Sequence, residues 1–282
     1  MGMEKLLEGA YDLHIHIAPD VVKRKCTERE AAKRMHARKM GGGAIKCHFF
    51  ETAARAALVS EDYPELKIVG GIALNRSVGG LNPEAVRQAG MVGAKMLWFP
   101  TMDALAFQTY KHRGDAAFSG EGLITACDAD GNLKQEVVEI LRIAAEYDMV
   151  VGTGHFSPEE GMKILRAAEE AGVRQVVLTH VEHPAIAYTV EQQKEAASMG
   201  AMIEHSLNNV YFDRCSFESF VEQIRAVGPE HVLLTGDFGQ ADAPYFDDAM
   251  VDYLEKMSPF FHEAELAMMI CENPEKVLGI RE

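Results

Sequence analysis

The chain is short of the residues that mark several classes of protein. Its 282 residues include five cysteines and one tryptophan, and 28 basic side chains stand against 43 acidic ones. The cysteines are widely spaced without a Cys-x-x-Cys pair, so neither a disulfide framework nor a thiolate zinc site is indicated. The formal charge of −15 leaves no basic face for a nucleic acid or an anionic membrane.

Long apolar runs and linkers are missing as well. The first residues, MGMEKLLEGAYDL, contain no secretory h-region, and no run approaches the ~18 apolar residues of a membrane span. No stretch rich in proline, glycine or serine divides the chain. We therefore expect residues 1–282 to form a single domain of a cytoplasmic protein, with no nucleic-acid or membrane partner. Whether the protein forms a homo-oligomer stays open.

The chain does contain short apolar runs, rich in β-branched residues, that alternate with amphipathic stretches. This alternation is typical of repeated βα units around a parallel sheet. The predicted strands are 11–17, 43–50, 67–74, 93–100, 149–155, 174–180, 200–205 and 231–237. The predicted helices include 27–40, 82–89, 134–147, 158–171, 189–199 and 216–227. Eight such units in 282 residues favour the α/β class and a closed (β/α)8 TIM barrel over an open sheet with a second domain.

One long segment, residues 101–133, interrupts the alternation after the fourth predicted strand. Loops that follow the strands of such a barrel lie over its carboxyl-terminal mouth, where binding residues gather. Loops of this length are uncommon and usually functional. We therefore expect residues 101–133 to form a lid or specificity loop.

Histidines gather near the ends of the predicted strands, where chemistry is carried in a barrel of this kind. Six of the eleven are placed there: His14, His16, His48, His155, His180 and His205. His14 and His16 are two positions apart, so both project from the same face of the first strand, together with Asp12. Two neutral imidazole nitrogens at that separation can share one metal ion.

A His-x-His pair alone is a weak indication of a metal, but the later strands repeat the pattern. His155 ends the run Val-Gly-Thr-Gly-His, and His180 ends Val-Val-Leu-Thr-His. Asp237 ends Leu-Leu-Thr-Gly-Asp on the eighth strand. Each is a metal-ligand residue type that terminates an apolar strand, so the sequence predicts a metal site at the mouth of the barrel.

This ordered set resembles the amidohydrolase superfamily, and the resemblance covers nearly the whole chain. It consists of Asp12-Leu-His14-Ile-His16 on the first strand, a lysine on the fourth, histidines on the fifth and sixth, and Asp237 on the eighth. Further stretches look like an uncharacterised branch of that superfamily, to which no reaction is assigned: Lys46-Cys-His48-Phe-Phe-Glu-Thr52-Ala-Ala-Arg55, Gly70-Gly-Ile-Ala-Leu-Asn75, Gly79-Gly-Leu-Asn82-Pro83, Trp98-Phe-Pro100-Thr101, Thr153-Gly-His155 and Asp237-Phe-Gly-Gln240.

The resemblance implies a metal-dependent hydrolase with Asp237 as the catalytic base toward a metal-activated water. The metal ligands it implies are His14, His16, Lys95, His155, His180 and Asp237. Zinc, as one or two ions, is the expected metal, although these ligands also suit manganese, iron or nickel. In binuclear members the lysine of the fourth strand carries a bridging carbamate, so Lys95 is the candidate for that group. Lys46 is the rival, because it shares a face of the second strand with His48.

Other polar residues near the strand ends are candidates for binding a small-molecule substrate: Lys46, His48, Asn75, Arg76, His183, Glu204 and Gln240. Convergence of Lys46, Arg76 and Arg113 would favour an anionic substrate such as a carboxylated cyclic amide or lactone. The expected reaction is hydrolysis of an amide, lactone or related ester-like bond. A decarboxylase or other lyase, a phosphoesterase, and a barrel that binds metal or ligand without turnover remain as alternatives.

Overall fold

The computed structural model describes residues 3–280 and contains one parallel sheet of eight strands in the order β1-β2-β3-β4-β5-β6-β7-β8. The strands are β1 (Tyr11–His16), β2 (Gly42–Lys46), β3 (Lys67–Ala73), β4 (Met96–Trp98), β5 (Val150–Gly152), β6 (Val176–Leu178), β7 (Met202–Ser206) and β8 (Val232–Thr235). Every predicted strand is present, most of them shortened by a few residues. The predicted (β/α)8 barrel is confirmed.

The barrel closes where the first strand meets the segment that follows the last one. Ile15 pairs in parallel with Phe238 through a single bridge. The His16 amide donates to the Phe238 carbonyl at 2.9 Å, and the Asp237 amide donates to the His14 carbonyl at 2.9 Å. The strongest contacts between the two edges therefore lie at the carboxyl end of the barrel.

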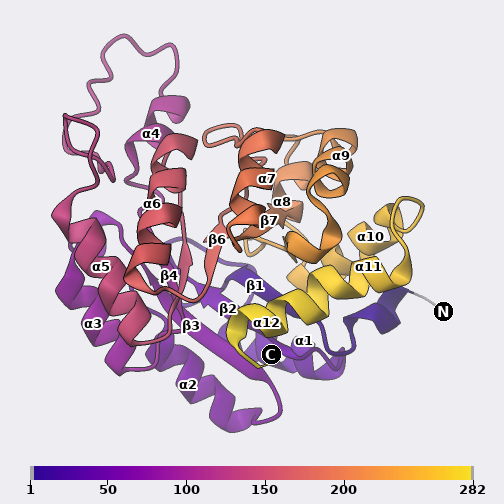
Figure 1. The fold of residues 1–282 in the computed structure, drawn as a ribbon. Helices are drawn as coiled ribbons and strands as arrows, with labels where there is room; N and C mark the ends of the chain where they lie inside the picture. The colour runs from indigo at the N-terminus through magenta and orange to yellow at the C-terminus, as the bar shows by residue number, and fades with distance from the viewer. Residues whose placement is uncertain (1–2, 281–282) are drawn as a thin grey trace.

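Helices surround the sheet, as Figure 1 shows. They are α1 (Glu28–Ala37), α2 (Ala53–Asp62), α3 (Pro83–Met91), α4 (Leu105–Lys111), α5 (Gln135–Glu146), α6 (Pro158–Ala171), α7 (Val190–Ser198), α8 (Leu207–Tyr211), α9 (Phe217–Val227), α10 (Phe246–Met257), α11 (Glu263–Ala267) and α12 (Asn273–Leu278). Short 3-10 helices span Met3–Leu7, Arg76–Val78 and Pro229–His231, and a π-helical turn spans Met268–Glu272. All six predicted helices are confirmed to within a few residues.

Local sequence explains where two of these helices begin. Thr27 accepts a hydrogen bond from the Glu30 amide while the Glu30 side chain accepts one from the Thr27 amide, which is the predicted capping box. Asn82, which like Thr27 has an extended backbone, caps α3 with its side chain. Pro83 occupies the first helical position, where its missing N–H costs nothing. These caps fix the crossovers that return the chain to the next strand.

Two apolar layers hold the barrel together. One lies between the strands and the outer helices, and the other fills the barrel interior with side chains such as Leu13, Val69 and Trp98. Val277 and Leu278 of α12 belong to the interior layer, so the end of α12 packs into the barrel. Within residues 3–280, no helix is long and apolar enough to cross a bilayer.

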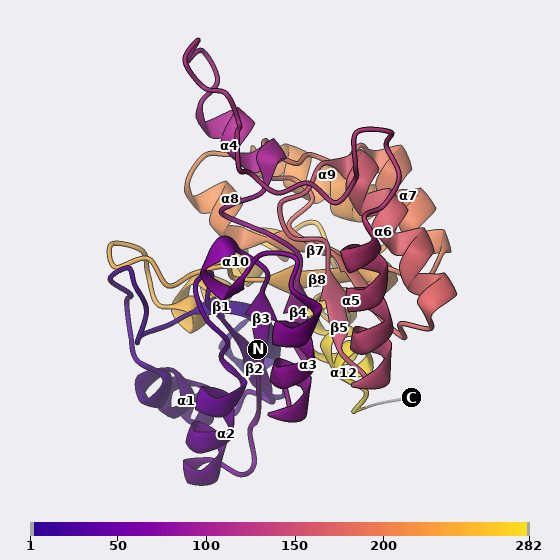
Figure 2. The same ribbon diagram turned by 90° about the vertical axis from the view of Figure 1, so that its left-hand side faces the viewer.

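The segment 101–133 divides into two parts. Its first part forms α4, which lies close to the mouth, whereas residues 111–117 are exposed and extend away from the barrel in Figure 2. The Phe107 ring of α4 lies 4.5 Å from the His155 ring, centroid to centroid. Met102 and Phe107 of this segment line the cavity at the mouth, residues 111–117 project beyond it, and the chain then returns to the fold, where Ile124 pairs with Ala104 and Ala126 is buried.

Candidate metal centre

Three predicted ligands meet at the carboxyl end of the barrel. His14 and His16 project from alternate positions of β1, and Asp237 follows β8. Oδ1 of Asp237 lies 3.2 Å from Nε2 of His14 and 3.1 Å from Nε2 of His16. One ligand atom from each residue lies within 4.8 Å of the other two, which is close enough for a single ion to bind all three.

Two further histidines complete the ring of nitrogens. His155 and His180 follow β5 and β6, and their Nε2 atoms lie 3.1 Å apart. The His180 ring stacks on the His14 ring with 5.8 Å between centroids. Nδ1 of both residues is buried and has no hydrogen-bond partner among the described residues. Buried imidazole nitrogens without a protein partner, in a cavity that Asp237 also lines, fit a cation.

Both strand-end residues that complete the site adopt left-handed backbone conformations. The φ angle is +28° at His180 and +53° at Asp237. Residues other than glycine rarely occupy this region, and aspartate tolerates it better than most. The backbone turns sharply here, and this turn aims the two side chains back over the barrel.

Burial keeps most of these imidazoles neutral. It lowers the pKa of His16 to about 4, although Asp237 opposes the shift. It also lowers the pKa of His180 to about 3 and the pKa of His155 well below its ordinary value. Burial would raise the pKa of Asp237, but His14 and His16 outweigh it and hold that pKa well below its usual range. Neutral imidazoles and an anionic carboxylate are the forms that bind a metal.

His14 differs from the other histidines because carboxylates surround it. Burial and Lys46 lower its pKa, but Asp237 and Glu204 outweigh both and raise it to about 9. Nδ1 of His14 lies 2.5 Å from Oε1 of Glu204. When Nδ1 donates a hydrogen bond to Glu204, Nε2 is left to face Asp237 and the cavity. A carboxylate behind a metal-binding histidine fixes the tautomer and orientation of the ring.

Glu204 therefore acts from behind His14, and the prediction that it contacts substrate is wrong. Its carboxylate is buried, accepts a 2.8 Å hydrogen bond from Thr235 and lies within hydrogen-bond distance of the His180 amide. Burial would raise the pKa of Glu204, but His14 outweighs burial and lowers it to about 2. An anionic Glu204 holds the inner side of the site in place.

A small cavity of about 120 Å³ opens over the metal ligands. Predicted site residues that line it are His14, His16, Lys46, His48, His155, His180, His183, Asp237 and Gln240. Residues that the sequence analysis did not assign to the site line it too: Arg24, Met102, Phe107, Asn208 and Arg214. Arg24 and Arg214 lie in loops with no regular period, so only their position after the first and seventh strands could have pointed to them.

Lys46 occupies the place that was predicted for Lys95. It is fully buried at the end of β2, and its Nζ lies 2.9 Å from Nε2 of His14. Burial lowers the pKa of Lys46 to about 8. Its Nζ also lies 5.1 Å from the centroid of the Trp98 ring.

The prediction that Lys95 binds the metal is wrong. Lys95 precedes β4 and lies at the amino end of the barrel, where its Nζ is 2.7 Å from both the carbonyl and the carboxylate of Asp148. A carbamate there would place a second negative group beside Asp148. The binuclear arrangement bridged by Lys95 is thereby removed.

Besides Glu204, two of the predicted substrate contacts, Asn75 and Arg76, lie outside the cavity. The Asn75 amide is satisfied within the protein, because Nδ2 donates to the Thr101 hydroxyl at 2.7 Å and Oδ1 accepts from the Thr101 amide at 2.9 Å. Arg76 pairs with Asp103 at 3.3 Å on the exposed side of the loop. Lys46, Arg76 and Arg113 therefore do not converge, so the condition under which these three would favour an anionic substrate is not met.

His205, the remaining strand-end histidine, faces away from the mouth. Its Nδ1 lies 3.3 Å from the Glu182 carboxylate, and its ring packs edge-on against Phe220 of α9. Successive side chains of a strand point to opposite faces, so His205 and its neighbour Glu204 look outward and inward respectively. His205 belongs to the outer packing layer.

Comparison with known proteins places the chain in a wider group. Residues 9–204 match the family described as Family of unknown function (DUF6282). None of the curated proteins matches the chain. The similarity to solved structures is therefore the more informative comparison for the fold.

Three solved structures share the fold along nearly their full lengths. An amidohydrolase from Pseudomonas aeruginosa superposes with a TM-score of 0.67 at 11% identity, covering 99% of this chain and 98% of the other. A probable 2-pyrone-4,6-dicarboxylic acid hydrolase from Acinetobacter baumannii gives 0.60 at 12% identity, covering 96% and 99%. A dihydroxybenzoic acid decarboxylase from Polaromonas sp. JS666, with manganese and 2-nitroresorcinol bound, gives 0.57 at 13% identity, covering 98% of each chain. The resemblance to the amidohydrolase superfamily is confirmed at the level of the fold.

Proposed function

The chain belongs to the DUF6282 family, and we propose that it is a metal-dependent hydrolase that cleaves an amide, lactone or related ester-like bond of a small molecule. The observation that carries this proposal is the meeting of His14, His16 and Asp237 within 4.8 Å at the mouth of the barrel. The solved structures that share this fold include proteins named as hydrolases, which supports the same reaction class.

The donor set fits one divalent ion. His14, His16 and Asp237 would hold it, with His155 and His180 beside them supplying nitrogens that have few protein partners. A bound divalent ion polarises the bond to be cleaved and lowers the pKa of water. We propose zinc as the resident metal, and manganese, which suits nitrogen and carboxylate ligands too and is present in the Polaromonas neighbour, as the first alternative.

Asp237 is the residue that moves the proton in this proposal. It is the one carboxylate among the described residues that line the cavity, and its side chain is 15% exposed to it. Because its pKa is held low by His14 and His16, it is anionic at neutral pH and can accept a proton from the attacking water. It then delivers that proton to the leaving group.

The remaining cavity residues orient substrate. Lys46 and His48 approach from β2 and the loop after it, while His183 and Gln240 approach from the loops after β6 and β8. Burial and, next, Arg214 lower the pKa of His183 to about 4, so it is a neutral hydrogen-bonding group. Phe107 covers His155 from α4 and shields the reacting bond from bulk water.

Metal analysis of the purified protein, followed by a panel of amides, lactones and phosphoesters in water enriched in 18O, tests the proposal. We expect about one divalent ion per chain and a hydrolysed product that carries one 18O atom. A metal-free protein, or turnover confined to phosphoesters, would overturn it. Asp237→Asn, purified in the same way, is the control for contaminating hydrolases: a contaminant would give the same activity in both preparations, whereas activity of this protein should fall steeply, and full activity in the variant would refute the role of Asp237.

Decarboxylation is the second candidate, because solved structures with this fold include two dihydroxybenzoate decarboxylases. The same labelling experiment separates the two reactions. A decarboxylase releases carbon dioxide and leaves the remaining product without 18O, whereas a hydrolase incorporates the label.

A further inference from the structure

Two arginines stand at the rim of the metal cavity, on either side of Gln240. Arg24 lies in the loop after β1, and its backbone pairs with Gln240. Arg214 lies in the loop after α8, which follows β7. Neither was expected from the sequence, and the proposed hydrolysis gives neither of them a task.

Arg214 is held by amides rather than by carboxylates. Its Nη1 donates to Oδ1 of Asn208 at 2.6 Å, and the other amide within reach is that of Asn209, at 3.4 Å. The Asn208 side chain in turn donates to the Asp237 carbonyl at 2.9 Å. Within residues 3–280 no carboxylate forms an ion pair with Arg214, so its positive charge is positioned but not neutralised.

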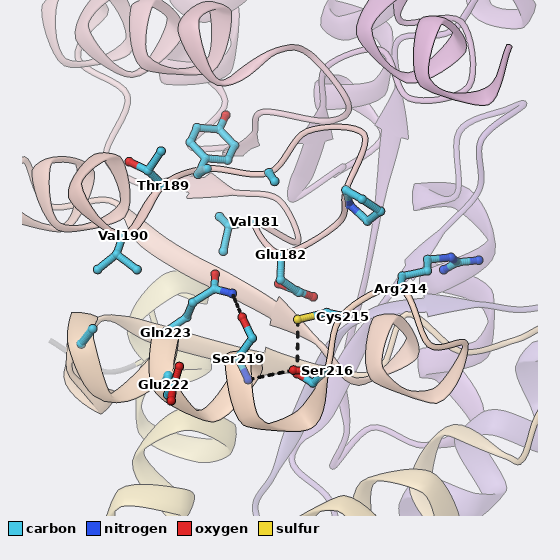
Figure 3. Close-up of a pocket in the computed structure, with 14 residues that line it drawn as sticks. Val181, Glu182, Thr189, Val190, Arg214, Cys215, Ser216, Ser219, Glu222 and Gln223 are labelled. Carbon is cyan, nitrogen blue, oxygen red and sulfur yellow. Dashed lines mark hydrogen bonds between the residues drawn. The ribbon is translucent and has the colours of Figure 1, made fainter. Parts of the chain in front are cut away.

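The backbone directs this side chain toward the mouth. Asp213, immediately before it, has a φ of +54°, which turns the chain sharply at the end of α8. In Figure 3 the Arg214 side chain extends away from Ser219 and Gln223, which line a second cavity of about 590 Å³ between α7 and α9. The guanidinium group thus lies in the wall between that cavity and the metal site, where its charge is also felt by His183.

Arg24 is anchored in a different way. Its Nε lies 2.6 Å from Oδ2 of Asp20, and its Nη2 lies 3.4 Å from Nδ1 of His16. Asp20 is fully buried at this pair and does not line the cavity. Asp20 therefore offsets the charge of Arg24 and also fixes the position of its side chain at the rim.

The lining of the cavity differs in charge from the chain as a whole, whose formal charge is −15. Three basic side chains line it, Arg24, Lys46 and Arg214, against the one carboxylate of Asp237. Asp20 offsets Arg24 from outside the cavity and Glu204 lies behind His14, so the excess of positive charge is carried by Lys46 and Arg214. A divalent ion at the metal ligands would add to this excess. A cavity with such an excess attracts anions and repels cations.

We propose that Arg214, with Arg24 on the other side of Gln240, receives a carboxylate group of the substrate. The planar guanidinium group matches a carboxylate through paired N–H donors, which a point charge cannot do. A volume of about 120 Å³ admits a small acid. This inference rests on the proposed function for the reaction, but the binding of the acid can be measured without turnover.

Titration calorimetry with malonate, succinate and glutarate, and with their neutral diamides, tests the inference on metal-loaded and metal-free protein. We expect at least one diacid to bind and the matching diamide not to bind. Arg214→Gln keeps a planar amide near Asn208 and should weaken diacid binding about 10- to 100-fold, the loss expected for hydrogen bonds to a charged group. Arg214→Lys keeps the charge without the paired donors, so its affinity for the diacid should lie between those of the unsubstituted protein and Arg214→Gln.

The matched control is Arg76→Gln, which removes an exposed arginine outside the cavity and should leave the affinity unchanged. Equal binding of acids and diamides, unchanged affinity in Arg214→Gln, or no binding of any diacid would overturn the inference. Inorganic phosphate that binds as tightly as the diacids would overturn the choice of carboxylate. A chain that binds no metal but loses diacid affinity in Arg214→Gln would refute the proposed hydrolase and leave the carboxylate site standing.

Discussion

A lysine and an aspartate lie near each other at each end of the barrel, Lys46 with Asp237 at the carboxyl end and Lys95 with Asp148 at the amino end, and of these two pairs the one at the amino end forms an ion pair. At the carboxyl end Lys46 is buried, and the neighbouring Asp237 contacts two histidines. At the amino end Lys95 binds Asp148 directly at 2.7 Å, and the Asp148 side chain is 57% exposed. Both aspartates even share a left-handed backbone, with φ of +53° and +50°. Residue type and local conformation are thus nearly the same, while the surroundings differ.

The two pairs differ in the number of other titratable groups around them and in how deeply those groups are buried. At the amino end Asp148 pairs with Lys95 and, at 3.1 Å, with Arg174, and water screens its exposed carboxylate. At the carboxyl end several strands deliver titratable side chains into one cavity, so each group changes the pKa of the next. The burial that lowers the pKa of Lys46 to about 8 is one such effect. Chemistry is therefore expected at the carboxyl end alone, and substitutions made in parallel at both ends test this.

The largest effect is expected from Asp237→Asn. Loss of the group that accepts the proton should lower kcat by about 10²- to 10⁴-fold, while asparagine tolerates the left-handed backbone and keeps the fold. The measurement is the turnover of the substrate found by the panel, together with the thermal midpoint of unfolding. Asp148→Asn is the matched control at the amino end. Equal losses from the two substitutions would contradict the division between the ends.

The next effect concerns the carboxylate behind a histidine. Glu204→Gln removes the anionic partner of His14 and should weaken metal affinity about 10- to 100-fold, because the ring loses its orientation. Competition with a fluorescent chelator measures this affinity. The chain provides a matched control, since His36 and Glu65 form the same pair at 2.6 Å on an exposed surface. Glu65→Gln should leave the metal affinity unchanged, and a change there would point to a global effect of charge.

Metal binding should release about one proton per chain near pH 7.5. The pKa of His14 is raised to about 9 in the metal-free fold, so this residue holds a proton that a cation must displace. The affinity for metal should therefore rise with pH up to about 9 and level off above it. Calorimetry in two buffers of different ionisation enthalpy counts the protons. Release of no proton at pH 7.5 would show that His14 is already neutral.

The same shift has a consequence for the stability of the metal-free protein. A group whose pKa is raised in the folded state stabilises that state fully below its unfolded pKa of 6.5. This contribution is lost as the pH rises through about 9. Chemical denaturation of metal-free protein between pH 6 and pH 10 is the corresponding measurement.

The smallest effect is expected from the two lysines. Lys46→Met removes a positive charge that lowers the pKa of His14, so the proton release should move to higher pH. Lys95→Met removes a surface ion pair worth about 1 kcal/mol or less and should leave that titration where it was. NMR of the histidine ring protons in metal-free protein follows both. A shift of equal size in the two variants would remove the distinction between the pairs.

The fold and the meeting of His14, His16 and Asp237, the candidate metal ligands, could be predicted because they depend on local patterns. Apolar runs fix the strands, Thr27 and Glu30 fix the start of a helix, and the strand ends place His14 and Asp237 at one mouth. Lys95 was misplaced because the resemblance assigned it a role, although its position at the start of the fourth strand puts it at the other end. A pattern of alternating residues does not say which end of the barrel a side chain reaches.

The rest of the site depends on loops that have no period. Arg24 and Arg214 reach the cavity only because the loops after β1 and β7 both fold over the mouth. The role of Glu204 depends equally on three-dimensional contact, since nothing in its own strand shows that His14 of β1 lies beside it. Contacts between residues that are distant in the sequence decide these positions, and such contacts cannot be predicted from the local patterns of a single sequence.

The closure of the barrel links the site to the order in which the protein folds. Asp12 accepts a hydrogen bond from the Gly236 amide, although the two residues are 224 positions apart in the sequence. Joining such distant segments is entropically costly and comes late, after local helices and neighbouring strands have formed. During synthesis, the edge of β1 that meets β8 stays unpaired until β8 has left the ribosome. The donor set of His14, His16 and Asp237 therefore exists only in the finished barrel, and nascent chains cannot bind the ion early through all three ligands.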